Sequence, residues 1–250
     1  MKVVYNRKYN SVYSSDPASA PGRMESICKE LHGNFEFVEA EPASGEDLGL
    51  VHGESHIGSI KRHELLYEVA ILAVGGAVKA SELAMQGEPA FGLIRPPGHH
   101  ASRDSSWGFC FFNNVAISVE KLRQTDKIAK ALIVDIDLHY GDGTDSIFSG
   151  NPQVAYFHVE GRNREMYLNA LTKCFTAMKD CDIVAVSAGF DRHEEDWGGL
   201  LKTEDYRTIG RRIKDFAEEI CQGRRYGVLE GGYNHSVLGK NVKSLLEGMT

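Results

Sequence analysis

This sequence contains no long apolar stretch. None of its 250 residues lies in a run near the ~18 apolar residues of a membrane-spanning helix, and residues 1–10 lack a signal-peptide core. Positive charge is also scarce, because 28 Lys and Arg face 35 Asp and Glu, leaving a net charge of -7. We therefore expect a cytoplasmic protein that binds neither a membrane nor, directly, nucleic acid.

Paired thiols are missing as well. The five cysteines are an odd number, and no two of them form a CxxC motif. This pattern predicts reduced, mainly structural thiols and argues against a thiolate zinc site, so any metal would be held by histidine and carboxylate. The sequence also lacks repeats, low-complexity tracts and long linkers. We expect residues 1–250 to form one domain.

Short apolar runs do occur, and they alternate with segments of helical spacing. Strands are expected near residues 2–5, 34–40, 91–94, 131–134, 154–157, 183–187 and 226–229. Helices are expected near residues 23–31, 65–86, 113–123, 144–148, 165–179, 203–222 and 236–247, with a polar connector at 42–49. This alternation predicts an α/β fold, with one open, mostly parallel sheet and helices on both faces.

Unusual polar residues follow the predicted strands. They are residues 95–100, residues 135–139, His158, Asp191 and Tyr233, each group after a different strand. In open α/β sheets the ligand crevice lies at the carboxyl ends of the strands. Position and residue type therefore both indicate a functional site at this edge.

The segment ALIVDIDLHYGD (131–142) is the centre of this pattern. If the chain stays extended beyond its apolar part, side-chain alternation places Asp135, Asp137 and His139 on one side. Buried carboxylates need a cation, which favours a divalent metal with Asp191 as a further ligand and one position open for water. The alternative is a solvated strand end in which Asp142 caps a helix.

Two histidine pairs need separate interpretations. His99 and His100, in RPPGHHA (95–101), suit acid–base chemistry if carboxylates orient them, and otherwise form a structural pair. His52 and His56 have the i, i+4 spacing of helical zinc ligands, but no glutamate stands beside His52 as in HExxH. We expect this second pair to pack against a helix or to lie on the surface.

A tyrosine is the last candidate site residue that the residue pattern by itself indicates. Tyr233 follows two glycines in LEGGYN (229–234), at the end of the last predicted strand. Its hydroxyl could donate a hydrogen bond to a developing oxyanion. The alternative is a buried tyrosine with a satisfied hydroxyl.

Five motifs in this order resemble the histone deacetylase and acetylpolyamine amidohydrolase family. They are RPPGHHA (95–101), GFCFFNN (108–114), DIDLHYGDGT (135–144), SAGFD (187–191) and LEGGYN (229–234). The resemblance implies the fold shared with arginase. It also implies hydrolysis of an N-acyl amide, such as acetyl-lysine, an acetylpolyamine or another small N-acyl amine, to a carboxylate and a free amine.

The resemblance further assigns a role to each site residue. It implies a catalytic Zn²⁺, or Fe²⁺, held by Asp137, His139 and Asp191. It pairs His99 with Asp135 and His100 with Asp142, and it makes His100 the base that deprotonates water and then the acid that protonates the leaving amine. Tyr233 would share the oxyanion with the metal, and Gly108 and Phe109 would line the tunnel for the acyl-bearing chain.

Three departures from the family pattern concern substrate recognition and cations. Tyr140 replaces a second histidine after His139. The strand that carries Ser-Leu-His in the family reads Tyr-Phe-His (156–158) here, so the serine that helps to hold a structural K⁺ is absent. The segment between His158 and Asp191 is also too short for the long rim loop of the family, which predicts an open cleft or one covered by a second subunit.

Two other functions fit parts of the pattern. An arginase-like binuclear Mn²⁺ ureohydrolase would need additional acidic and histidine ligands, and the sequence has RPPGHHA and Tyr233 instead. A non-catalytic protein that binds acyl-lysine would not need the two histidines and Tyr233, since binding requires no proton relay.

Overall fold

A parallel β-sheet of seven strands forms the centre of the computed structural model, which describes residues 1–178 and 180–250. The strands are β1 (Lys2–Tyr5), β2 (Glu36–Glu39), β3 (Ala90–Gly92), β4 (Ala131–Asp135), β5 (Val154–His158), β6 (Ile183–Ala188) and β7 (Arg225–Leu229). Their order is β2-β1-β3-β7-β6-β4-β5, and each strand pairs with its neighbours in parallel.

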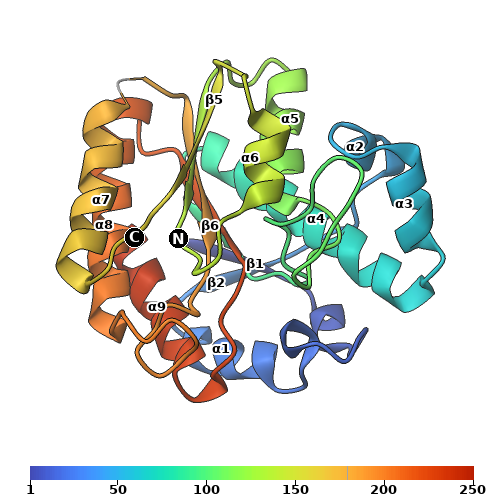
Figure 1. Cartoon of the computed structure of the whole chain (residues 1–250), viewed down its shortest axis with the longest axis horizontal. Helices are drawn as coiled ribbons and strands as arrows, with labels where there is room; N and C mark the ends of the chain where they lie inside the picture. Colours follow the sequence, from blue (N-terminus) through green and yellow to red (C-terminus); the bar gives the residue numbers. More distant parts are fainter. Residues whose placement is uncertain (179) are drawn as a thin grey trace.

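Helices cover both faces of this sheet (Figure 1). The helices are α1 (Arg23–Leu31), α2 (Gly45–Gly49), α3 (Glu54–Lys61), α4 (Glu64–Met85), α5 (Asn114–Gln124), α6 (Asp142–Phe148), α7 (Arg164–Ala177), α8 (Thr203–Cys221) and α9 (His235–Met249). Helices α4, α5 and α6 lie on one side, and α1, α7, α8 and α9 lie on the other. The predicted α/β fold with a parallel sheet is confirmed.

The core forms where apolar strands and small helical residues meet. Strands β4 and β6 are buried along their whole length, as expected of strands covered on both faces. Helix α4 lies close to the sheet because Gly76 has no side chain, and a Cβ there would come within 2.6 Å of Ile94 Cγ2. None of the helices in residues 1–178 and 180–250 is long and apolar enough to cross a membrane.

Several local predictions were wrong. Strand β4 ends at Asp135, so Asp137 and His139 lie on a loop and the alternation argument does not apply to them. Residues 42–49 contain the short helix α2, which a capping box between Ser44 and Asp47 begins. Helix α7 ends at Ala177, and the predicted end at Lys179 lies outside the described residues.

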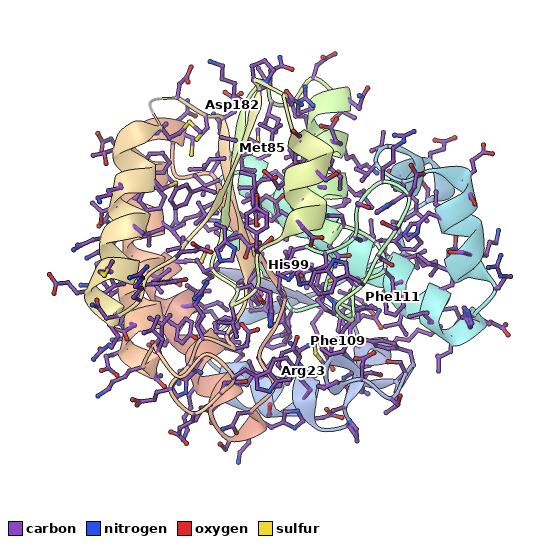
Figure 2. All side chains as sticks on the ribbon, in the orientation of Figure 1. Arg23, Met85, His99, Phe109, Phe111 and Asp182 are labelled. Atoms are coloured by element: carbon purple, nitrogen blue, oxygen red, sulfur yellow. The ribbon has the colours of Figure 1, made fainter. Side chains whose placement is uncertain are left out.

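The strand order brings the polar segments together. Strands β3, β7, β6, β4 and β5 are successive neighbours, although they are distant in sequence. The loops after these strands therefore share one edge of the sheet. In Figure 2, His99 lies near the middle of the molecule, Asp182, just before β6, lies near the top of the view, and Phe109 lies below His99.

Candidate active site

Three side chains at this edge form a group that can hold a metal ion. Asp137 and His139 come from the loop after β4, and Asp191 follows β6. His139 Nδ1 lies 3.3 Å from Asp137 Oδ1 and 3.1 Å from Asp191 Oδ2. The three ligand atoms lie within 4.8 Å of one another, and both carboxylates are buried.

The local hydrogen bonds leave one carboxylate oxygen free. Asp137 Oδ2 accepts from Gly231 N at 2.8 Å, and Asp191 Oδ1 accepts from Leu138 N at 3.0 Å. Asp191 Oδ2 is buried without a hydrogen-bond partner. A buried acceptor of this kind needs a cation or a donor, so these residues fit a divalent metal with one His and two carboxylate ligands.

The charges in this group also favour a bound cation. Burial and the charge of Asp137 raise the pKa of Asp191 to about 6. The nearby carboxylates of Asp137 and Asp191 raise the pKa of His139 to about 10. Two buried carboxylates therefore create a negative potential at the position between these side chains, and that potential attracts a positive charge.

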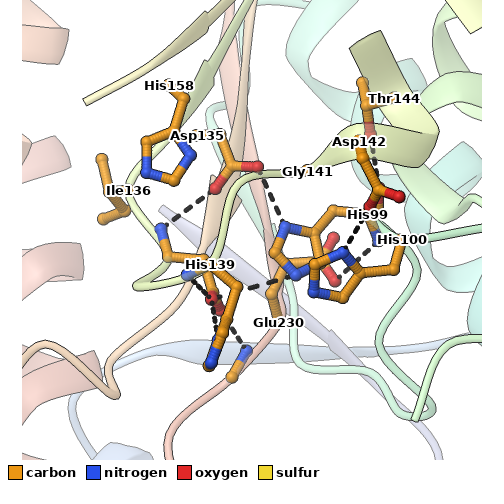
Figure 3. A network of polar contacts seen from close by, with 12 residues as sticks. His99, His100, Asp135, Ile136, His139, Gly141, Asp142, Thr144, His158 and Glu230 are labelled. Atoms are coloured by element: carbon orange, nitrogen blue, oxygen red, sulfur yellow. Dashed lines mark hydrogen bonds and ion pairs between the residues drawn. The ribbon is translucent and has the colours of Figure 1, made fainter. Parts of the chain in front are cut away.

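His99 and its partner Asp135 are buried and belong to a network of polar contacts (Figure 3). Its Nδ1 donates to Asp135 Oδ2 at 3.0 Å, and the Tyr156 hydroxyl donates to the same oxygen at 2.9 Å. Burial opposes a charge on His99, but the carboxylates of Asp135 and Asp137 outweigh it and hold the pKa of His99 well above its ordinary range. Asp135 thus pairs with His99 and is not part of the metal-binding group.

His100 forms a second pair with a different environment. Its Nδ1 donates to Asp142 Oδ1 at 2.7 Å, and Trp107 Nε1 donates to the other oxygen of Asp142 at 2.9 Å. The Trp107 ring also packs on His100, with 4.0 Å between ring centroids. Burial and the neighbouring His99 lower the pKa of His100, against the raising effect of Asp142.

Aromatic residues surround the remaining side of the site. The Tyr233 ring stacks on Trp197 at 4.1 Å and meets Phe109 edge-on at 5.9 Å. Burial, together with the charge of Asp137, raises the pKa of Tyr233 far above neutral pH, so its hydroxyl keeps its proton. Gly108 has a φ of 60° and lies against His100, where a Cβ would come within 2.5 Å of the ring.

The other histidine pair lies behind the site and has a structural role. His52 precedes α3 and does not share a helix with His56. Its Nδ1 donates to the Ser102 carbonyl at 2.9 Å, and its Nε2 accepts from Asn113 N at 2.9 Å. His56 bonds the Phe111 carbonyl at 2.8 Å. Both are buried and hold the loops that carry the site, so packing was the right expectation and surface exposure was wrong.

Sequence reasoning missed four residues near the site. They are Trp107, Arg192, Trp197 and Glu230. Glu230 is fully buried, and its Oε2 accepts from Gly98 N at 2.7 Å. A second group that could hold a metal combines Glu230 with His99 and Cys110. A carboxylate directly after an apolar strand was a usable signal for Glu230, whereas Arg192 and Trp197 lie in a polar loop that gives no such signal.

Fold and site together define an open α/β protein with a histidine–carboxylate centre at the carboxyl edge of its sheet. The sequence model of the histone deacetylase domain matches residues 17–167 and 158–249. The chain belongs to the histone deacetylase and acetylpolyamine amidohydrolase family.

Individual relatives agree with this assignment. A probable deacetylase of Methanothermobacter thermautotrophicus is 28% identical over 304 aligned positions, which cover all of this chain and 90% of the relative. Histone deacetylase 5 of Arabidopsis thaliana is 32% identical, and the match covers 96% of this chain and 47% of that protein. The chain therefore spans about half the length of this plant relative.

A solved structure supports the fold independently. The crystal structure of the HDA15 HD domain superposes with a TM-score of 0.88, at 23% sequence identity, over 98% of this chain and 88% of the other. This similarity concerns the fold alone.

Proposed function

We propose that residues 1–250 form a metal-dependent deacetylase domain, which hydrolyses an N-acyl amide to a carboxylate and a free amine. The observation that carries this proposal is the unpartnered Asp191 Oδ2, which faces Asp137 and His139 beside two His–Asp pairs. The relatives include proteins named polyamine deacetylase in Mus musculus and histone deacetylase-like amidohydrolase in Pseudomonas aeruginosa.

Different residues of the site have different roles in the proposed reaction. When bound by Asp137, His139 and Asp191, Zn²⁺ or Fe²⁺ would polarise the amide carbonyl and lower the pKa of water. Asp142 engages His100 Nδ1, which leaves His100 Nε2 free to take a proton from the attacking water and to return it to the leaving amine. Tyr233, which stays protonated, donates to the developing oxyanion.

The other histidine has a supporting role. His99 is buried beneath His100, with 4.0 Å between the ring centroids, and Asp135 fixes its orientation. Its positive charge partly balances the buried carboxylates. Gly108 and Phe109 flank the entry for the acyl chain, because Gly108 lies against His100 and Phe109 against Tyr233.

The substrate that we propose is an acylated amine in the cytoplasm, rather than a nucleic acid or a membrane component. The metal ligand His139 is 41% exposed, so the site is open to solvent in the single chain. An open site can accept small N-acyl amines as well as an acyl-lysine side chain. A second copy of the chain could cover it.

Metal analysis of two variants tests this function. Purified wild type should carry a single divalent ion per chain, and Asp191→Ala should lose it because one of three ligands is gone. Asp182→Ala is the matched control, because Asp182 accepts from Ala129 N and Lys130 N at the far end of the sheet. Wild type that holds no stoichiometric metal and gains no activity with zinc or iron would contradict the proposal, and two metals per chain would favour the arginase-like alternative.

A further inference from the structure

Four carbonyls in the segment that carries the metal ligands are already engaged by donors of the protein itself. Each backbone carbonyl of residues 135–138 already accepts a hydrogen bond from the protein. The donors are Val159 N to Asp135 (2.9 Å), the Tyr167 hydroxyl to Ile136 (3.2 Å), Arg192 Nε to Asp137 (3.1 Å) and Arg192 Nη2 to Leu138 (3.1 Å). A monovalent cation at these carbonyls would have to compete with these donors, two of which come from a positively charged guanidinium.

The Asp135 carboxylate is equally occupied. Its Oδ1 accepts from Asp137 N at 3.0 Å, and its Oδ2 accepts from both His99 and Tyr156. Tyr156 takes the place of the family's serine, and its hydroxyl also accepts from Gly141 N at 2.8 Å. The tyrosine therefore ties the strand end to the loop that follows it, and its hydroxyl has no role left as a cation ligand.

The Arg192 guanidinium places a positive charge of the protein itself beside the carbonyls of Asp137 and Leu138. The Arg192 side chain is buried, and the residue is only 8% exposed. Its Nη2 contacts His158 Nε2 at 2.8 Å, and its guanidinium lies 5.2 Å from the centroid of the Tyr167 ring. Arginine keeps its charge when buried and forms several directed hydrogen bonds at once, which suits it to replace an ion among carbonyl oxygens.

The elements around Arg192 belong to the shortened part of the chain. Helix α7 starts at Arg164, soon after β5, and places the fully buried Tyr167 beneath residues 135–138. Arg192 itself directly follows Asp191. The same short segment that removes the family's rim loop thus supplies the donors that fill the cation position.

We propose that Arg192, supported by Tyr156 and Tyr167, replaces the structural monovalent cation, and that this protein needs no K⁺ or Na⁺. Arg192 is then a positioning residue. It holds the carbonyls of Asp137 and Leu138, and so fixes the backbone between the metal ligands Asp137 and His139. This second role rests on the metal site proposed above, whereas independence from K⁺ does not.

Wild-type protein in different salts provides the first test. Its melting temperature, with and without zinc, and its zinc affinity should be equal in about 0.1 M KCl, NaCl and choline chloride, since these salts screen charge alike. Thallium(I), a K⁺ substitute, should show no saturable uptake in equilibrium dialysis. A melting temperature or zinc affinity that rises specifically with K⁺, or one thallium ion bound per chain, would overturn the proposal.

Arg192→Met, compared with a matched control, provides the second test. Zinc affinity, measured by competition with a chromophoric chelator, should fall by about 10–100-fold, the usual cost of losing a partner of metal ligands. The control is Arg225→Met, because Arg225 is also buried and also donates to a carbonyl, that of Met249, far from the site. Arg225→Met should lower stability and leave zinc affinity unchanged.

The remaining outcomes of these experiments also support or overturn the proposal. Unchanged zinc affinity in folded Arg192→Met overturns the positioning role. If this variant does not fold, Arg192→Lys keeps the charge but loses the fork of donors, and should show an intermediate loss of zinc affinity. Wild type that takes up neither zinc nor iron would refute the proposed function, and the salt comparison on metal-free protein would still decide whether a monovalent cation is needed.

Discussion

At the level of single residues, the two adjacent His–Asp pairs differ in the burial of the carboxylate and in the pKa of the histidine. His99 and Asp135 are both buried, and the pKa of His99 is raised. His100 is also buried, but the side chain of its partner Asp142 is 49% exposed, and the pKa of His100 is lowered. A lowered pKa keeps His100 neutral near physiological pH, as a general base requires. This difference supports the division proposed above, with proton transfer by His100 and a fixed charge on His99.

Removal of the proton-transfer groups gives the first prediction at this scale. His100→Ala and Tyr233→Phe should each lower kcat by ~10² or more, while metal content stays normal. Tyr140→Phe is the control, since Tyr140 is exposed and stacks on His158 away from these groups. Near-normal turnover of Tyr233→Phe would show that another group stabilises the oxyanion.

The Asp142 carboxylate gives a prediction about pH. Asp142 raises the pKa of His100, so Asp142→Asn should lower that pKa further and make His100 a weaker base. The base is active when deprotonated, so the acidic limb of the kcat/KM profile should move to lower pH and kcat should fall, though less than in His100→Ala. Trp107→Phe removes one hydrogen bond to Asp142 and leaves more negative charge on the carboxylate that faces His100, so its acidic limb should move the other way, to higher pH.

The control for these profiles is Trp197→Phe, because Trp197 packs on Tyr233 and makes no hydrogen bond to Asp142. Its acidic limb should coincide with that of wild type. If the acidic limb of the kcat/KM profile does not shift in Asp142→Asn, a group other than His100 is responsible for that limb.

At the level of elements, the turn between β7 and α9 joins the strand ends. Glu230 Oε2 accepts from the backbone of Gly98 and His99, and Gly231 N donates to Asp137. A Cβ at position 231 would lie 2.6 Å from Asp137 Oδ2, so only glycine permits this approach. One turn therefore connects the loops after β3, β4 and β7.

Glu230 makes stability depend on pH. Burial raises the pKa of Glu230 from 4.5 to about 7. Between these values the folded protein binds a proton that the unfolded chain has released, so stability falls as pH rises through this window. In metal-free protein, urea unfolding should show a loss of up to about 3 kcal/mol from pH 4.5 to 7 that Glu230→Gln lacks. Equal pH slopes in the two proteins would contradict this assignment.

At the scale of the whole molecule, the site lies open at the surface of a single chain. The side chain of His139 is 41% exposed, and two exposed tryptophans lie nearby: Trp107 (56%) packs on His100, and Trp197 (54%) lies 6.1 Å from the His139 ring. Water reaches an open site, and this weakens the electrostatic interactions that catalysis uses. Modest turnover and weak selection of the amine part of the substrate should follow.

Specificity profiling tests this expectation. A panel of acetylated peptides and small acyl-amines should differ by less than about 10³-fold in kcat/KM, because larger discrimination needs several kcal/mol of placed contacts. Longer acyl chains should still be limited by Gly108 and Phe109. A stronger preference for one peptide would contradict the open site. If it appears only where sedimentation shows self-association, a second copy supplies the missing wall.

The sequence by itself determined the sheet and its parallel direction, and it indicated the carboxyl edge as the place of the candidate site. These follow from local patterns, since apolar runs and helical spacing are properties of neighbouring residues. The segments RPPGHHA, DIDLHYGD and LEGGYN also marked His99, His100, Asp135, Asp137 and Tyr233 as candidate site residues, because unusual polar residues after strands are visible without knowing what they contact.

Tertiary structure alone decided which of these residues meet. The crossovers place β7 between β3 and β6, so Glu230 reaches the backbone of His99 and Gly231 reaches Asp137. Arg192 looks like one more charge in a polar loop of the sequence, yet it is buried against the carbonyls of Asp137 and Leu138. Such partners depend on chain segments that only folding brings together, and no local pattern encodes them.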